Sequence, residues 1–375
     1  MGNNMRFLYI LSVTGIFLSA VFLPNISRAT HVRAGEITTK LISKTSLTYE
    51  ITFTAYYDYT SGPTGGKQAA DLAEEYTMCF GDGTTEVVKR SKISYINGNT
   101  SSINIYKTIH TYSGPGTYTI GITVVNRNRG TVNLPPPGES QNIPFFVSTT
   151  IYVNAALLTN STPVMLNPPL DSGRVGQKFC HNPAAFDADG DSLAYRLSVP
   201  KTSPTDNGCQ GRNITVYQDP TRFGSASETG GASTFSINPI TGDLCWDAPG
   251  QAGQFNFAFI IEEWRNGVLI GEITRDMQIV VVDSPNKRPL IQPIPDLCVE
   301  AGTLINQPVT ATDPDGNRVI ISGFGGVFNV GQDGVALPAG ELIQPAYARL
   351  VNGGITQNQK NRKPFSSLMN YWQTT

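Results

Sequence analysis

The chain contains few of the residues on which enzymes and nucleic-acid-binding proteins depend. Three of its 375 residues are histidine, and only 15 % are charged. Its 27 basic and 29 acidic residues nearly balance and form no basic stripe, which argues against nucleic-acid binding. The His-Glu-x-x-His, Gly-x-Ser-x-Gly and P-loop motifs are absent, so the sequence predicts a protein that is not an enzyme.

Long apolar runs are also scarce, and the one that exists lies at the N-terminus. Arg6 precedes the apolar run 7–23, and Ser27-Arg28-Ala29 places small residues where a signal peptidase needs them. Residues 1–29 are therefore predicted to be a secretory signal peptide. An uncleaved anchor is the alternative, because the run is near the lower length limit for a membrane span. After cleavage no spanning segment remains, so we expect a secreted or cell-surface protein.

The five cysteines show no zinc-ligand spacing. Disulfides are permitted in an exported protein. Cys180 and Cys245 both lie on strand-like segments that should face the core, which favours a bridge between them. The alternative is that all five are buried free thiols, since free cysteine packs as a small hydrophobe.

What the chain does contain favours strands and turns. Glycine (37) and proline (25) are plentiful. Residues 36–42 and 47–57 alternate apolar and polar side chains, which predicts a β-hairpin with Lys44 and Thr45 near its turn. Residues 117–124 alternate in the same way after a Pro-Gly turn, which is typical of a half-buried antiparallel strand.

Two blocks in this region point to a known module. Cys79-Phe-Gly-Asp-Gly-Thr84 and His110-Thr-Tyr, followed by Pro115-Gly-Thr-Tyr118, resemble the PKD (polycystic-kidney-disease) domain, although Met78 and Cys79 stand where that family has Trp and Asp. The resemblance implies an immunoglobulin-like β-sandwich that acts as an extracellular spacer or binding module. We assign residues 30–155 to this unit, including its N-terminal hairpin.

A second unit is expected over residues 156–285. Thr241-Gly-Asp-Leu-Cys-Trp246 and the aromatic strand that follows it resemble cadherin-like and immunoglobulin-like repeats of bacterial surface proteins, and turn signals every 8 to 12 residues independently favour a sandwich. Gly176 and Gly302 are 126 residues apart, and so are the turns that begin at Asp187 and Asp313. This repeat predicts a partial third copy over 286–350. Residues 351–375 show no strand pattern, and either a truncated chain or a natural irregular tail explains them.

The order of these blocks resembles the large secreted, gliding-motility-associated proteins of Bacteroidetes, over residues 30 to about 330. The resemblance implies a place at the cell surface. The predicted fold is therefore all-β, with tandem immunoglobulin-like β-sandwiches, PKD-like and then cadherin-like.

Calcium is the expected cofactor, because cadherin-like repeats bind it with Asp-x-Asp turns and linker residues. Carboxylates at i and i+2 of an extended loop point the same way, and calcium takes roughly six to eight oxygen ligands. The alternative is that each Asp-Gly is simply a hairpin turn. The candidate ligands are Asp187, Asp189 and Asp191 in the first turn, Asp283 and Asn286 in the linker, and Asp313, Asp315 and Asn317 in the second turn.

Other polar and aromatic residues are given mainly structural roles. Asp82 should cap its own turn, and His110 should be packed and hydrogen-bonded. The adjacent Glu262 and Glu263 should point to opposite faces of a strand, which excludes a glycosidase pair. Tyr57 and Trp264 could stack on sugars, although alternation favours Tyr57 in the core.

The sequence thus predicts a non-catalytic extracellular adhesion protein. Its expected partner is an extracellular protein or a polysaccharide. The alternative is a polysaccharide-binding accessory module of a secreted system.

Overall fold

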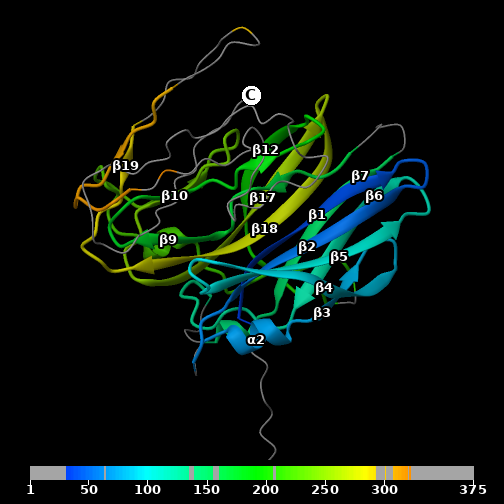
Figure 1. Ribbon diagram of the computed structural model, residues 1–375, viewed down its shortest axis with the longest axis horizontal. Coiled ribbons are helices and arrows are strands. Elements are labelled where there is room, and N and C mark those ends of the chain that lie inside the picture. The colour runs from blue at the N-terminus through cyan, green and yellow to red at the C-terminus, as the bar shows by residue number, and fades with distance from the viewer. Residues whose placement is uncertain are drawn as a thin grey trace, which may run out of the picture.

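The protein is built almost entirely from antiparallel strands (Figure 1). The computed structural model describes residues 31–62, 65–134, 139–154, 160–205, 208–292, 300, 307–319 and 321. Within these residues, helix is confined to α2 (Lys67–Leu72) and to two 3-10 turns, Ser140–Asn142 and Pro220–Phe223. The predicted mostly-β, antiparallel class is confirmed. The predicted signal peptide, Cys298 and the tail over 351–375 lie outside the described residues.

Most strands belong to one 13-stranded sheet. Its path runs β12-β17-β18-β1-β2-β5-β4-β3-β6-β7-β13-β14, and β9 pairs with β18 in parallel. The strands are β1 (Val32–Ser43), β2 (Thr48–Asp58), β3 (Glu75–Cys79), β4 (Thr85–Ile96), β5 (Ser101–Thr111), β6 (Gly116–Val124), β7 (Phe145–Val153), β9 (Leu170–Arg174), β12 (Ser192–Ser198), β13 (Lys201–Thr202), β14 (Arg212–Asn213), β17 (Gly253–Arg265) and β18 (Val268–Val282).

The smaller sheets contain the remaining strands. They are β10 (Phe179–His181), β15 (Thr234–Ile237) and β16 (Leu244–Asp247) in one sheet, β8 (Val164–Met165) with β11 (Ala185–Phe186), and β19 (Leu290–Ile291) with β20 (Ala311–Thr312).

The two local predictions about strands are confirmed. β1 and β2 form an antiparallel hairpin in which Ser43 lies opposite Thr48, and residues 44–47 make the turn. In β6, Ile120, Ile122 and Val124 are buried while Thr117 is exposed. Period-2 alternation is sufficient to fix both elements, because each has one face against apolar side chains.

The sheet crosses the position at which the sequence predicts a domain boundary. β18 pairs with β1, where Gly35 lies opposite Asp276, and with β7, where Gly271 lies opposite Ile151 (Figure 1). A Cβ on Gly35 would come within 3.0 Å of the Thr54 carbonyl oxygen, so a larger residue there would fit only if its neighbours shifted. Strands of the predicted first and second units thus hydrogen-bond directly, and the boundaries near 155 and 285 stay a prediction.

Two hydrophobic cores lie on opposite faces of the β1–β2 part of the sheet. Tyr57 belongs to the first core together with Phe53 and Ile51, whereas the adjacent Tyr56 belongs to the second. The second core is centred on Trp246 and also includes Phe255, Phe257 and Phe259. Residues of β2 thus contribute to both cores, and the two cores share one sheet.

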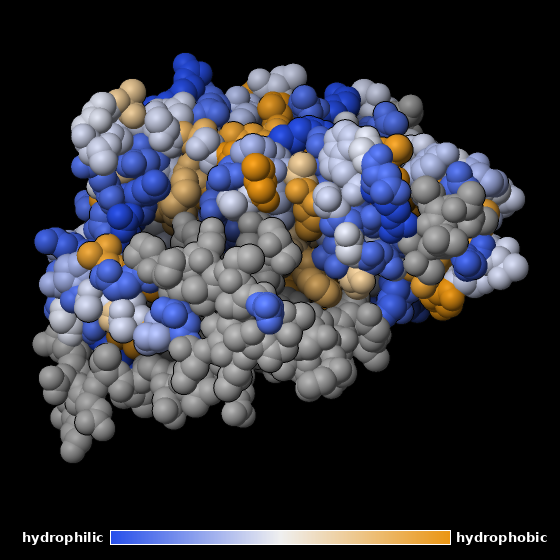
Figure 2. All heavy atoms as spheres, turned by 90° about the horizontal axis from the view of Figure 1, so that it is seen from above, coloured by the Kyte–Doolittle hydropathy of each residue, from blue (hydrophilic) through white to orange (hydrophobic). Residues whose placement is uncertain are grey.

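In the face drawn in Figure 2, hydrophobic residues are visible singly or in small groups among hydrophilic ones.

Two buried ion pairs are made by neighbouring residues of β18, one with Arg127 outside the strands and one with β1. Asp276 of β18 accepts hydrogen bonds from Arg127 (3.0 and 2.7 Å), and Arg275 donates to Glu36 of β1 (3.0 Å). All four side chains are at most 5 % exposed. Removing one member of such a pair would leave a buried charge uncompensated.

Two disulfides connect distant segments. The predicted bridge between Cys180 and Cys245 is confirmed, and it joins paired positions of β10 and β16. A second bridge joins Cys79 at the end of β3 to Cys209, 130 residues later. No sequence pattern predicts this second pairing, because Cys79 and Cys209 fall in different predicted units.

The 126-residue repeat is visible in strand pairing. In the first copy Val164 lies opposite Phe186 and Met165 opposite Ala185. In the second copy Leu290 lies opposite Thr312 and Ile291 opposite Ala311, which are the same four positions shifted by 126 residues. The described part of the predicted third copy therefore repeats the start of the second unit, while its further extent stays a prediction.

Candidate metal centre

The first acidic turn connects β11 to β12 and is organised by its own first residue. One oxygen of Asp187, Oδ1, accepts the backbone N–H groups of Asp189 (2.9 Å) and Asp191 (3.0 Å). Gly190 has a φ of +84°, which side chains rarely tolerate. This local geometry follows directly from the Asp-x-Asp-Gly sequence and leaves the other oxygen of Asp187 available.

The structure brings together two of the three carboxylates predicted in this turn. Asp187 and Asp191 face Glu263 of β17, and each of the three offers an oxygen within 4.8 Å of the others. Asp189 points elsewhere, since its Oδ2 accepts the backbone N–H of Ser161 (2.7 Å). The acidic cluster therefore consists of Asp187, Asp191 and Glu263.

Glu263 was not predicted as a ligand, although β17 carried a signal for it. The inward face of this strand is formed by alternate residues from Phe255 to Ile261, and Glu263 is the next position of the same face. A carboxylate on the buried face of a strand costs free energy unless a hydrogen bond or an opposite charge compensates it. Pairing of Leu193 with Glu263 in the β12–β17 ladder then places this carboxylate beside the turn.

Two neighbouring side chains complete the surroundings of the cluster. Arg265 donates to both oxygens of Asp191 (Nε to Oδ1, 2.6 Å; Nη2 to Oδ2, 2.5 Å), and Arg265 also donates to the amide oxygen of Asn160 (2.8 Å). The amide nitrogen of Asn160 donates to Oε2 of Glu263 (3.3 Å). Three carboxylates and one guanidinium carry formal charges of −3 and +1, which leaves −2. A divalent cation has the charge that would neutralise this site.

Two oxygens of the cluster are buried without a hydrogen-bond partner among the described residues. They are Oδ2 of Asp187 and Oε1 of Glu263, and the Glu263 side chain belongs to a residue only 1 % exposed. Most buried polar atoms in proteins have a partner, so such a pair indicates that a cation or a proton occupies the space between them.

The pKa values of Asp187 and Glu263 also indicate that a cation or a proton is needed at this point. Burial and, to a smaller extent, the nearby Asp187 raise the pKa of Glu263 to about 9. Burial also raises the pKa of Asp187, with Asp191 and Asp189 adding to the effect, although the backbone N–H of Asp191 opposes it. Without a cation the site holds a proton at neutral pH. With a cation both carboxyls can ionise.

The donor set fits a hard cation. Carboxylate and amide oxygens suit calcium and magnesium, whereas zinc sites usually contain histidine or cysteine. The described residues of this cluster include no nitrogen or sulfur ligand.

The second acidic turn repeats the first one in its backbone contacts. Asp313 Oδ1 accepts the N–H groups of Asp315 (2.8 Å) and Asn317 (3.1 Å), and Asp315 Oδ2 accepts the N–H of Lys287. Each bond matches one in the first turn at a distance of 126 residues. Asn317 donates to the amide oxygen of Asn286 (2.7 Å), so these two predicted ligands lie together.

The last predicted ligand, Asp283, is exposed, and no hydrogen bond or ion pair joins it to the described residues. Within those residues, the second turn is not accompanied by a third carboxylate.

Asp82 and His110 have the structural roles predicted for them. Asp82 Oδ1 accepts the backbone N–H (3.0 Å) and hydroxyl (2.6 Å) of Thr84, and Oδ2 lies 2.7 Å from Nε2 of His110. The imidazole stacks on Phe80 with ring centroids 4.0 Å apart. Burial opposes ionisation of Asp82, but the hydrogen bonds from Thr84 and His110 outweigh it and lower the pKa of this carboxyl.

The aromatic residues considered for sugar stacking are not free platforms. Tyr57 is 0 % exposed and lies in the first core, as alternation favoured. Trp264 is half-buried, and its Nε1 donates to Glu262 (3.2 Å). Glu262 also pairs with Arg196 (2.6 Å) on the face opposite to the buried Glu263, which confirms that the two glutamates point apart.

Comparisons with known proteins give the chain no family. No protein-family model matches it, and no curated protein matches it. The resemblances to PKD domains, cadherin-like repeats and gliding-motility-associated proteins therefore stay predictions. In the part of the chain that the structure describes, no helix has the length and hydrophobicity needed to cross a bilayer.

Proposed function

We propose that this is a non-catalytic extracellular structural or adhesion protein, made of immunoglobulin-like β-sandwich modules and stiffened by calcium. Its modules would be PKD-like first and cadherin-like after that, and its contacts would be with a protein or polysaccharide at the cell surface. Two disulfides support an extracellular place, because such bonds persist in oxidising compartments.

The observation that carries the proposal is the pair of unpartnered carboxylate oxygens at Asp187 and Glu263. Calcium at this point would be held by Asp187, Asp191 and Glu263, with the Asn160 amide close by. It would supply a charge that removes the cost of burying the carboxylates. Calcium is favoured over magnesium because its larger, flexible shell tolerates carboxylates that a protein fold has placed irregularly.

The position of the cluster explains how an ion would stiffen the molecule. Asn160 begins the segment that enters the predicted second unit. This segment is already bonded to β1, through the Thr162 N–H to the Thr39 carbonyl oxygen (2.9 Å) and the Leu41 N–H to the Ser161 hydroxyl (3.1 Å). An ion at the cluster would add β12 and β17 to this junction. Its role would be mechanical, since it would fix where the segment and the two strands meet.

Thermal unfolding of the full chain tests the proposal. We expect calcium to raise the midpoint relative to chelator, by a free energy of about 2.7 kcal/mol at 100 times the dissociation constant. Magnesium at the same concentration should raise it less. If calcium left the unfolding midpoint unchanged, the result would count against a bound calcium ion and against its stiffening of the molecule.

The adhesive part of the proposal needs its own measurement. Cells that display the chain should adhere to an extracellular protein or polysaccharide surface more than otherwise identical cells that do not display it. Equal adhesion by both cell types would argue against a role in contact.

A further inference from the structure

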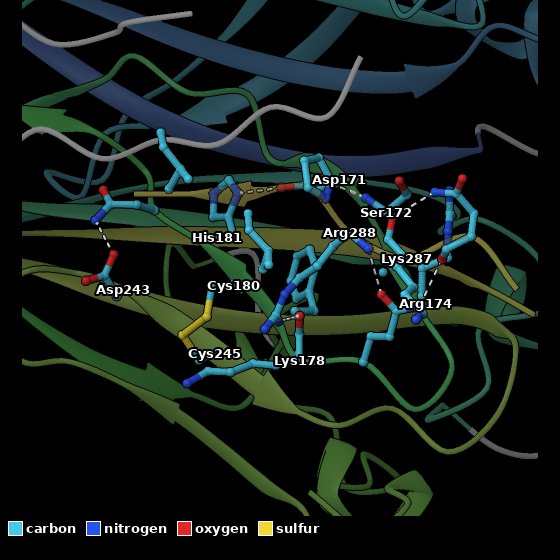
Figure 3. A pocket seen from close by; sticks show the side chains of 18 of the residues that line it. Asp171, Ser172, Arg174, Lys178, Cys180, His181, Asp243, Cys245, Lys287 and Arg288 are labelled. Atoms are coloured by element: carbon cyan, nitrogen blue, oxygen red, sulfur yellow. Dashed lines mark hydrogen bonds and ion pairs between the residues drawn. A yellow bond between two sulfur atoms is a disulfide. The ribbon is translucent and has the colours of Figure 1, made fainter. Parts of the chain in front are cut away.

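A cavity of about 700 Å³ lies where the predicted second unit meets the start of the next repeat (Figure 3). It is bounded by β9 and β10, by the connection between β15 and β16, by the segment 286–291, and by the second acidic turn. Its volume falls within the roughly 300–1,000 Å³ typical of pockets that bind small ligands. It is distinct from the acidic cluster at Asp187, Asp191 and Glu263.

The walls of this cavity are fixed by side chains that join the two segments. Gln177 donates to the carbonyl oxygen of Asn286 (2.9 Å) and accepts the N–H of Arg288 (2.9 Å). Arg288 in turn donates to the Lys178 carbonyl oxygen (2.7 Å) and to Glu228 (2.8 Å). The disulfide between Cys180 and Cys245 also lines the cavity, as Figure 3 shows. A ligand would therefore meet a preformed site, which lowers the entropic cost of binding.

The charged residues that line the cavity are mainly basic. The basic residues are Arg174, Lys178, Lys287, Arg288 and Arg318. The acidic residues are Asp171, Asp243 and Asp313.

The acidic groups already have partners within the protein. Asp243 accepts from Asn182 (2.9 Å) and Thr241 (2.7 Å), and Asp313 accepts two backbone N–H groups. By contrast, the side chains of Lys178 and Lys287 are exposed and have no hydrogen bond or ion pair with any residue that the structure describes. The cavity therefore has positive charge to offer to a ligand.

A buried histidine gives an independent sign that something binds here. His181 lines the cavity and is 2 % exposed, with Nδ1 lying 3.5 Å from Asp171 (Figure 3). Its other ring nitrogen, Nε2, is buried without a hydrogen-bond partner among the described residues. An unpartnered buried polar atom beside a cavity is the feature that a polar ligand group would satisfy.

We propose that this cavity binds an acidic oligosaccharide, in which a carboxylate or sulfate pairs with Lys178 and Lys287. Serine and asparagine side chains among the lining residues suit sugar hydroxyls, and they include Ser172, Ser236 and Asn238. Nucleic acid is a poor fit because the aromatic lining residue, Phe179, is buried and offers no stacking platform. The inference rests on the proposed adhesive function, because the oligosaccharide would be the partner that the protein contacts.

Calorimetric titration of the full chain tests the inference, in calcium and again in chelator. The probes are a hexuronate trisaccharide, a sulfated trisaccharide and a neutral trisaccharide of similar linkage. We expect at least one acidic sugar to bind at least 10-fold more tightly than the neutral one. The double variant Lys178→Gln/Lys287→Gln should weaken that binding about 10- to 100-fold, as expected for lost hydrogen bonds to a charged group.

The matched control is Lys89→Gln/Lys92→Gln, which removes the same charge from two exposed positions of β4. This control should bind like the wild type. The inference fails if neither acidic sugar binds, if the neutral sugar binds equally well, or if the control weakens binding as much as the cavity variant.

An acidic peptide of equal charge that binds as tightly as the sugars would overturn the saccharide assignment. The calcium result and the sugar result are separable, because calcium is read from the unfolding midpoint and sugar binding is measured in both conditions.

Discussion

The buried carboxyl of Glu263 makes the strongest prediction about stability. In chelator, the folded protein must keep this group protonated at neutral pH, because its pKa of about 9 lies far above the ordinary 4.5. Protonating it at pH 7 costs about 1.4 kcal/mol for each of the roughly 2.5 pH units between pH 7 and 4.5, so at most about 3.5 kcal/mol. The substitution Glu263→Gln removes this cost, since an amide is neutral and can still accept from Asn160.

The direction of the pH dependence follows from the raised pKa. A group of this kind contributes its full stability below its unfolded pKa and loses it as the pH rises through the folded pKa. In chelator, the wild type should therefore lose stability as the pH rises from about 5 to 9. The advantage of Glu263→Gln should grow from under about 1 kcal/mol at pH 5 to at most about 3.5 kcal/mol at pH 7.

Urea unfolding at several pH values, with and without calcium, measures both effects. Calcium should stabilise the wild type and have little effect on Glu263→Gln, which loses a charged ligand. The matched control is Glu262→Gln on the opposite face of β17, which should keep the calcium response and change stability by under about 1 kcal/mol. The reasoning is refuted if Glu263→Gln in chelator is no more stable than the wild type at pH 7 and above. It is also refuted if calcium stabilises both equally.

Three further substitutions test other parts of the structure. Cys79→Ser opens a bridge that spans 130 residues, so the free energy of unfolding should fall by about 4 kcal/mol in urea, and peptide mapping without reduction should show the Cys180–Cys245 bridge intact. Asp276→Asn leaves the Arg127 guanidinium buried without its counter-charge and should cost about 3–5 kcal/mol, whereas Glu50→Gln, which breaks an exposed pair, should cost under about 1 kcal/mol in the same assay. Asp82→Ala removes a turn cap and should lower stability by about 1–2 kcal/mol; because its pKa is lowered in the folded state, this loss should be present above pH 4 and should shrink as the pH falls below it.

Local features of the fold could be predicted from the sequence because short-range chemistry decides them. Alternation of side chains fixed the β1–β2 hairpin and the buried face of β6. Asp-x-Asp-Gly fixed the hydrogen bonds within both acidic turns, since they join residues two and four positions apart. The period of 126 residues predicted that a later segment repeats an earlier one, and the ladders of β8 with β11 and of β19 with β20 repeat at this offset.

The cluster required a strand register that no local pattern specifies. Asp187 was recognised because it shapes its own turn, whereas Glu263 reaches it only through the pairing of β12 with β17. The turn also contains Asp189, whose spacing matched a ligand as well as its neighbours did. A contact with Ser161, 28 residues away, directs it elsewhere.

By itself, then, the sequence determined that the chain is rich in antiparallel strands, where its turns fall, and which side chains line each strand's apolar face. These properties depend on interactions between residues a few positions apart, which do not require the rest of the chain to fold. Only the tertiary structure decided that β18 lies beside β1, that Cys79 meets Cys209, and which three carboxylates gather around one point. Those contacts join residues up to about 240 positions apart, so only the pairing and packing of strands distant in the sequence bring them together.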